Sequence, residues 1–155
     1  MVEELPRDGH AVALARISEE AERRTGALDL SGLDLTSLPP SLSDLRHLRS
    51  LDCSSTEVMS LEPLAGLIAL QSLKCSSTEV MSLEPLAGLL ALQSLNCSRT
   101  EIESLEPLAN LNALESLDCS YTEIASLEPL RNLTALQSLD CSCTAVTSLA
   151  PLASL

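Results

Sequence analysis

The sequence predicts an α/β solenoid, in which short coils stack on one another and share one parallel β-sheet. A 22-residue pattern repeats in tandem, and its copies at 48–69 and 70–91 are identical at 19 positions. The chain is 45% hydrophobic, yet it holds no Phe, no Trp and one Tyr. A core without large rings has to be a regular lattice of aliphatic side chains, which stacked repeats provide.

Six copies of the pattern follow one another. They occupy residues 27–47, 48–69, 70–91, 92–113, 114–135 and 136–155. Within a copy, Leu51 and Cys53 alternate with Asp52, which is the period of a strand with one buried face. Leucines then recur every third residue from Leu61, which predicts a tight 3₁₀-like turn opened by Pro63. Each coil should therefore carry a strand on one side and a turn on the other.

The period and spacing match the leucine-rich repeat pattern. The phrases IESLEPLANLNAL and IASLEPLRNLTAL resemble the 22-residue repeats of internalin-like bacterial proteins. The resemblance implies a short parallel sheet on the concave side and a 3₁₀ or irregular convex side. Threonine stands where those repeats usually carry asparagine, and it can make only part of the asparagine hydrogen-bond ladder. These positions are Thr56, Thr78, Thr100, Thr122 and Thr144, with Leu33 in the first copy.

Residues 1–26 are interpreted as an N-terminal cap for the stack. A helix is predicted over His10–Thr25, with Asp8 as its N-cap and Gly26 just beyond its C-terminal end. Such a helix would cover the open apolar end of the first coil. The stretch RRTGALDLSGLDLTSLPPSL also resembles leucine-rich regions of bacterial Roco-type multidomain proteins.

The predicted helix has a buried face and a charged face. Leu14, Ile17 and Ala21 share one side and are expected to be buried. Two pairs of opposite charge at i,i+4 spacing are expected on the exposed side, namely Glu19–Arg23 and Glu20–Arg24.

The last repeat ends as PLASL, so Leu149, Leu152 and Leu155 are expected to be unshielded. Two interpretations follow. The chain is cut from a longer protein, or this end meets a partner, including self-association through the three leucines.

Five of the six cysteines recur every 22 residues and alternate with polar neighbours. Cys53, Cys75, Cys97, Cys119 and Cys141 are therefore predicted to face the core as a ladder of small hydrophobic side chains. Cys143 falls outside this column and is expected to be exposed. Unpaired thiols favour a reduced, cytoplasmic protein, with delivery into a host cell as the alternative.

Twenty-two acidic against nine basic residues give a net charge of −13. This charge argues against binding to nucleic acid or to an anionic membrane surface. No segment has the length of a membrane span or the pattern of a signal peptide. Two columns of glutamates are interpreted as a solvated rim in preference to a site for a basic partner or for calcium. The columns are Glu57, Glu79, Glu101, Glu123 and Glu62, Glu84, Glu106, Glu128.

Motifs for catalysis are absent from the sequence. His10 and His47 are the only histidines, and no Ser–His–acid or Cys–His arrangement can be assembled from them. No glycine-rich phosphate loop or metal-ligand motif occurs. We therefore expect no enzyme activity, no cofactor and no metal site in this chain.

The concave side is predicted to bind another protein. Two exposed columns change residue type while their surroundings stay constant, and tyrosine and arginine are enriched at interface hot spots. The candidate residues are Arg49, Asp52, Lys74, Asn96, Arg99, Asp118, Tyr121, Asp140 and Cys143, with Arg99 and Tyr121 as the expected anchor. The alternatives are a recognition segment of a larger enzyme, such as a Roco-type GTPase or an effector ligase, and a self-assembling scaffold.

Overall fold

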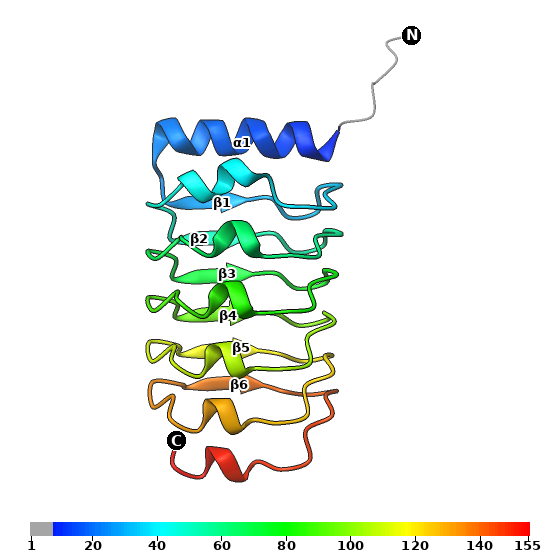
Figure 1. Ribbon diagram of the computed structural model, residues 1–155, viewed down its shortest axis with the longest axis vertical. Coiled ribbons are helices and arrows are strands. Elements are labelled where there is room, and N and C mark those ends of the chain that lie inside the picture. Colours follow the sequence, from blue (N-terminus) through cyan, green and yellow to red (C-terminus); the bar gives the residue numbers. More distant parts are fainter. Residues whose placement is uncertain (1–7) are drawn as a thin grey trace.

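The computed structural model describes residues 8–155 as one elongated stack of coils beneath a helix (Figure 1). Residues 1–7 of the predicted cap lie outside the described residues. Helix α1 (Gly9–Arg23) comes first, and six parallel strands follow in chain order. The strands are β1 (Ala27–Asp29), β2 (Ser50–Asp52), β3 (Ser72–Lys74), β4 (Ser94–Asn96), β5 (Ser116–Asp118) and β6 (Ser138–Asp140). The predicted solenoid is confirmed.

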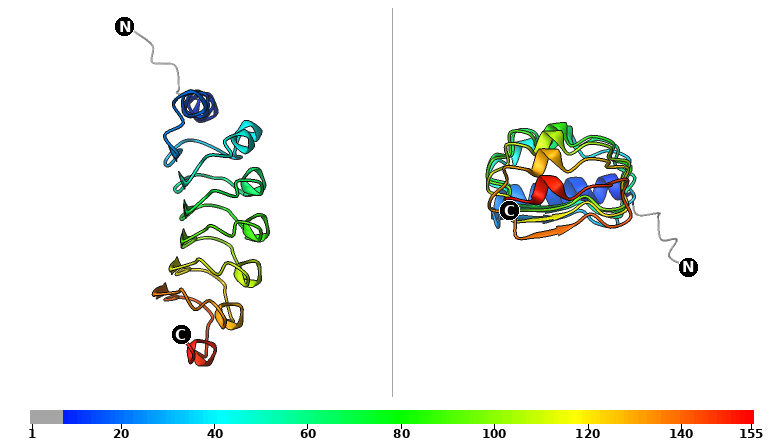
Figure 2. Two further views of the ribbon diagram at one scale, coloured as in Figure 1. Left: turned by 90° about the vertical axis from the view of Figure 1, so that its left-hand side faces the viewer. Right: turned by 90° about the horizontal axis from the view of Figure 1, so that it is seen from below.

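A 3₁₀ turn lies across each coil from its strand. The turns span Pro40–Asp44, Glu62–Leu64, Glu84–Leu86, Glu106–Leu108, Glu128–Leu130 and Ala150–Leu152. Figure 2 shows the strands close together along one side and the turns further apart along the other. The sheet therefore lies on the inner side of a shallow arc. We call the outward-pointing residues of the six strands and of the bends that follow them the sheet face.

Stacking in register produces the core. Leu51 pairs with Leu73, Leu73 with Leu95 and Leu95 with Leu117. Each of these four side chains is at most 1% exposed. Removing one leucine side chain from water stabilises a fold by about 1.5–3 kcal/mol, so a repeated column of leucines dominates the stability of the stack.

The cysteine ladder also faces the core. Cys53, Cys75, Cys97 and Cys119 are buried, whereas Cys141 in the last coil is half-buried and Cys143 is exposed. Burial, reinforced by the nearby Asp52 carboxylate, raises the pKa of the Cys53 thiol to about 12. Burial raises the pKa of the Cys75, Cys97 and Cys119 thiols as well, so the four buried thiols stay protonated and act as packing groups.

The threonines close a turn within each of the last five coils. The Thr56 hydroxyl donates to the Cys53 carbonyl at 2.8 Å, and Thr100 donates to Cys97 at 2.7 Å. Backbone groups supply bonds between coils at this edge, as where the Glu79 N–H donates to the Val58 carbonyl at 3.0 Å. A hydroxyl is thus sufficient at this position because it serves its own coil only.

Helix α1 differs from the sequence prediction in the face it buries. Ala13 and Ile17 are buried, whereas Leu14 is 42% exposed and Ala21 is exposed. Gly9 sets this rotation, because a Cβ there would overlap the backbone of Asp34. The face that contains Gly9 therefore approaches the first coil, and the predicted burial of Leu14 and Ala21 is wrong.

The C-terminal end of α1 also differs from the prediction. Asp8 is the N-cap as expected, and its carboxylate accepts the His10 N–H at 3.0 Å. The helix ends at Arg23, and Arg24 takes the left-handed conformation with φ 52°. Gly26 has φ 85° but lies in the following turn, so its predicted role directly after the helix is wrong.

Glu20 joins the cap to the first coil instead of forming an exposed pair with Arg24. Its buried carboxylate accepts the Gly26 N–H at 2.7 Å and lies 2.9 Å from His47 Nε2. Burial on its own raises the pKa of the Glu20 carboxyl. Hydrogen bonds from Thr25, Gly26 and His47 together have the larger, opposite effect, so the pKa is lowered overall. The other expected pair is present on the surface, where Arg23 lies 3.1 Å from Glu19.

Candidate protein-binding surface

One column of residues on the sheet face has left-handed backbone conformation in all six coils. Its φ values run from 52° to 68°. We call it the left-handed column, and its members are Gly32, Ser55, Ser77, Arg99, Tyr121 and Cys143. For a residue with a Cβ this conformation costs about 1–2 kcal/mol, and only glycine adopts it freely. Five of the six positions carry this cost.

Backbone hydrogen bonds hold the column in place. In the first five coils the N–H of the column residue donates to a serine carbonyl of the next coil, as from Arg99 to Ser120 at 2.9 Å and from Tyr121 to Ser142 at 3.0 Å. The backbone is therefore fixed by its neighbours, while the side chains of Arg99 and Tyr121 are exposed. The column presents whichever side chain the sequence places there.

Arg99 and Tyr121 form the one aromatic contact of the column. The Arg99 guanidinium carbon lies 4.2 Å from the centre of the Tyr121 ring, and Tyr121 is 49% exposed. A cation–π contact at an exposed site contributes about 0.5–1 kcal/mol, and it reduces the freedom of two long side chains. The two residues expected to anchor a partner are thus adjacent and preordered.

The second variable column has a role in the fold that the sequence analysis missed. Asn96 Oδ1 accepts the Ser98 hydroxyl at 2.7 Å, and Asp118 Oδ1 accepts the Ser120 hydroxyl at 2.6 Å. The same side chains accept the backbone N–H of those serines. Asp52 and Asp140 bond Ser54 and Ser142 in the same way. Lys74 is the exception in the column, because it has no acceptor. An Asx residue followed two positions later by serine is the signal that could have identified these turns.

The remaining predicted residues extend the surface without converging on one point. Arg49 is exposed in the second coil, where its backbone N–H donates to the Gly26 carbonyl at 2.8 Å. Cys143 is exposed in the last coil. The predicted set is therefore a strip along the stack, and within it Arg99 stacks on Tyr121.

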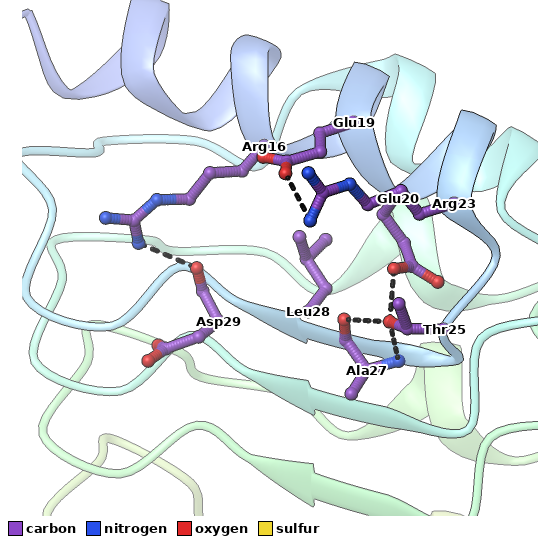
Figure 3. A pocket seen from close by; sticks show the side chains of 8 residues that line it. All are labelled: Arg16, Glu19, Glu20, Arg23, Thr25, Ala27, Leu28 and Asp29. Carbon is purple, nitrogen blue, oxygen red and sulfur yellow. Dashed lines mark hydrogen bonds and ion pairs between the residues drawn. The ribbon is translucent and has the colours of Figure 1, made fainter.

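A hollow of about 380 Å³ lies between α1 and β1 (Figure 3). Arg16 crosses it, and one guanidinium nitrogen donates to the Asp29 carbonyl at 2.8 Å. The Thr25 hydroxyl lies 3.2 Å from the Ala27 carbonyl, which is also on the outer edge of β1. These groups complete the hydrogen bonding of an edge strand, so the polar lining of this hollow serves the cap.

Two general findings concern residues 8–155. No group of three or more His, Cys, Asp or Glu side chains among them could hold a metal ion. No helix in this range combines the length and the apolar character needed to cross a membrane.

Comparison with known proteins identifies the type of repeat. The family model described as Leucine Rich repeats (2 copies) matches residues 112–154. Internalin C2 of Listeria monocytogenes is similar over 83% of this chain and 56% of its own chain, with 34% identity and a TM-score of 0.79. A comparison with curated proteins gave no match.

Two further solved structures are similar in fold. The internalin inlF of Listeria monocytogenes matches 98% of this chain and 50% of its own, at 21% identity and a TM-score of 0.81. The leucine-rich repeat domain of a Shigella effector matches 95% of this chain and 62% of its own, at 25% identity and a TM-score of 0.72. This chain therefore spans between half and two thirds of the structures it resembles. It is a leucine-rich repeat protein of bacterial type, with coils that resemble those of the internalins.

Proposed function

We propose that this chain is a non-catalytic module that binds another protein through its sheet face, with Arg99 and Tyr121 at the centre of the interface. One observation carries the proposal. Two large side chains, stacked on each other, occupy backbone positions that favour glycine. Residues held in costly conformations with no contribution to the core are candidates for function.

The energies favour binding over a structural role for this pair. Each left-handed position costs about 1–2 kcal/mol when it is not glycine. The contact between Arg99 and Tyr121 returns about 0.5–1 kcal/mol. The pair thus destabilises the unbound protein on balance, whereas tyrosine and arginine are among the side chains that contribute most to binding energy at interfaces.

The comparisons support the general class of this function. Leucine-rich repeat domains like those of the internalins and the Shigella effector are typically protein-binding modules. Because this chain spans only part of the structures it resembles, we also propose that it acts as the recognition segment of a larger protein. A GTPase or ligase domain encoded elsewhere in the same reading frame would identify the kind of larger protein.

The experiment uses a photo-crosslinking amino acid at position 121 to identify the partner, followed by calorimetric titration of the purified pair. The double variant Arg99→Ala/Tyr121→Ala should weaken the affinity about tenfold or more. The matched variant Ser55→Ala/Ser77→Ala changes the same column two coils away and should retain the affinity. An unchanged affinity in the Arg99→Ala/Tyr121→Ala variant, with its circular dichroism unaltered, would remove this site from the proposal.

Self-association is a second candidate function, and the last coil favours it. Leu149 is 62% exposed and Leu155 is 42% exposed. A hollow of about 310 Å³ beside them is lined by Leu136, Leu139, Leu152 and Leu155, together with Gln137 and Ser138. If two copies meet here, light scattering should report a dimer that the variant Leu149→Ser/Leu155→Ser abolishes. A monomer at high concentration would exclude this function for the 155-residue chain.

A further inference from the structure

Two exposed methionines lie at equivalent positions of neighbouring coils, the second and third, and neither belongs to the predicted set of protein-binding residues. Met59 is 57% exposed and Met81 is 59% exposed, although the valines directly before them are fully buried. Both methionines occupy the connection from a strand to its 3₁₀ turn, in two coils with the identical sequence CSSTEVMSLEPLAGL. We call them the methionine pair. Exposed apolar side chains that recur at one place in a fold indicate a contact surface.

A hollow of about 390 Å³ lies along the same edge of the stack. It is lined by Gly32, Leu33, Asp34, Ser55, Thr56 and Glu57, so it sits between the first and second coils. Gly32 borders open space, because a Cβ there would meet no atom within 4 Å, whereas the other coils carry a side chain at this position. Glu57 belongs to the lining and precedes Met59 by two residues, and both side chains are exposed on the same connecting segment while Val58 between them is buried.

Unpaired carboxylates surround this surface. Among residues 8–155, acidic side chains form ion pairs only at Glu19, Glu20 and Glu128. Asp34, Glu57 and Glu79 are exposed, and none of the three takes part in these ion pairs. Residues 50–155 as a whole hold 13 acidic and three basic side chains. An apolar pair within such a field attracts a partner that is both apolar and positively charged.

We propose that the hollow and the methionine pair together bind a basic amphipathic segment of a partner protein. A lysine or arginine enters the hollow, where its aliphatic stem lies against Leu33 and its charge meets Asp34 and Glu57. An apolar side chain of the same segment packs on Met59 and Met81, whose flexible thioethers adapt to different shapes. This site is separate from Arg99 and Tyr121 and does not depend on their function.

The test measures binding of a fluorescent synthetic peptide of alternating lysine and leucine to the full chain by anisotropy. Variant Met59→Ser/Met81→Ser removes the apolar contact without changing charge, and it should weaken the peptide affinity about tenfold. Its matched control is Ile68→Ser/Leu90→Ser. These residues are also exposed, at 68% and 61%, but they lie on the opposite connection of the same two coils. The control should change the affinity less than about twofold.

Charge is tested in the same way. Variant Glu57→Gln/Glu79→Gln should weaken the peptide affinity more than Glu106→Gln/Glu115→Gln, which removes the same number of charges elsewhere. A peptide of alternating lysine and serine should bind less tightly than the lysine and leucine peptide. The proposal is overturned if the lysine and leucine peptide does not bind, or if the methionine variant and its control weaken it equally. Equal weakening would show that the peptide adheres to the acidic surface as a whole and not to this site.

Discussion

Residues 48–91 and residues 92–135 are two pairs of coils with the same interior and different exteriors. Their leucine, cysteine and threonine columns are buried alike. Outside, the first pair carries Met59, Met81, Ile68 and Leu90 on its connections, and small serines on the left-handed column. The second pair has polar residues or alanine on the connections, and Arg99 and Tyr121 on the column. A stacked lattice therefore separates folding from recognition, because inward and outward positions of a coil vary independently.

The same comparison places the two proposed contact surfaces on different coils. The methionine pair lies in the second and third coils, and the Arg99–Tyr121 pair lies in the fourth and fifth. Both surfaces are produced by substitutions at exposed positions of one template. The predictions below test whether the interiors are equivalent and whether the exteriors differ as described.

The largest expected difference is in thiol reactivity. Cys75 and Cys97 represent the two regions, and burial raises the pKa of both thiols above its usual range. Each should react with iodoacetamide at least roughly a thousandfold more slowly than exposed Cys143, because reaction requires opening of the stack. Mass spectrometry of timed samples measures the rates. Rapid labelling of either buried cysteine would show that its region is open in solution.

Core truncation should affect both regions equally. Leu73→Ala and Leu117→Ala each remove one fully buried leucine from the same column. Each should lower the free energy of unfolding by about 2–5 kcal/mol, through lost burial and the cavity that remains. Urea denaturation monitored by circular dichroism gives the values. A difference of several kcal/mol between the two variants would contradict equivalent interiors.

The turn after each strand should distinguish the third coil from the fifth. Asp118→Ala removes the acceptor for two bonds from Ser120 and should lower the free energy of unfolding by about 1 kcal/mol. Lys74→Asn introduces the acceptor that Asn96 already supplies in the next coil, and it should raise stability by roughly 0.5–1 kcal/mol. The same denaturation measurement applies. A loss of stability in Lys74→Asn would show that lysine contributes to the fold at this position.

The smallest expected effect concerns the left-handed column itself. Ser77 has φ 54°, so Ser77→Gly removes a steric cost while it adds freedom to the unfolded chain. The two effects together should raise the free energy of unfolding by roughly 0.5–1 kcal/mol, as urea denaturation would measure. Ser77→Val is the opposite control, since a β-branched residue is strained there and should destabilise the protein. A destabilised glycine variant would be incompatible with the left-handed conformation.

Periodicity made the coils predictable, and local contacts explain the failures. Alternation of Leu51, Asp52 and Cys53 is enough to place a strand and its buried face, because the same pattern recurs in every copy. The face of α1 depends instead on one close approach at Gly9, which helical periodicity does not contain. The buried Glu20 depends on His47, 27 residues away in the sequence. Non-repeated contacts of this kind leave no signal in a single sequence.

The candidate surface was predictable in part. Variation at Arg99 and Tyr121 against a constant background marked both positions, but their stacking and left-handed backbone are consequences of the coil geometry. The second variable column, which contains Asp118, showed the same variation, and its Asp and Asn side chains close turns by accepting hydrogen bonds from serine. Variation alone therefore does not separate a recognition residue from a capping residue, whereas the hydrogen bonds do.

The most direct test of the central claim is the free energy of unfolding of the variant Arg99→Gly/Tyr121→Gly. If the pair is displayed for recognition on an independent scaffold, relief of two left-handed positions offsets the lost cation–π contact. The stability should then stay within about 1 kcal/mol of the original protein, or rise. A loss of about 3 kcal/mol or more would be the size of a core truncation, and it would show that these side chains hold the fold together.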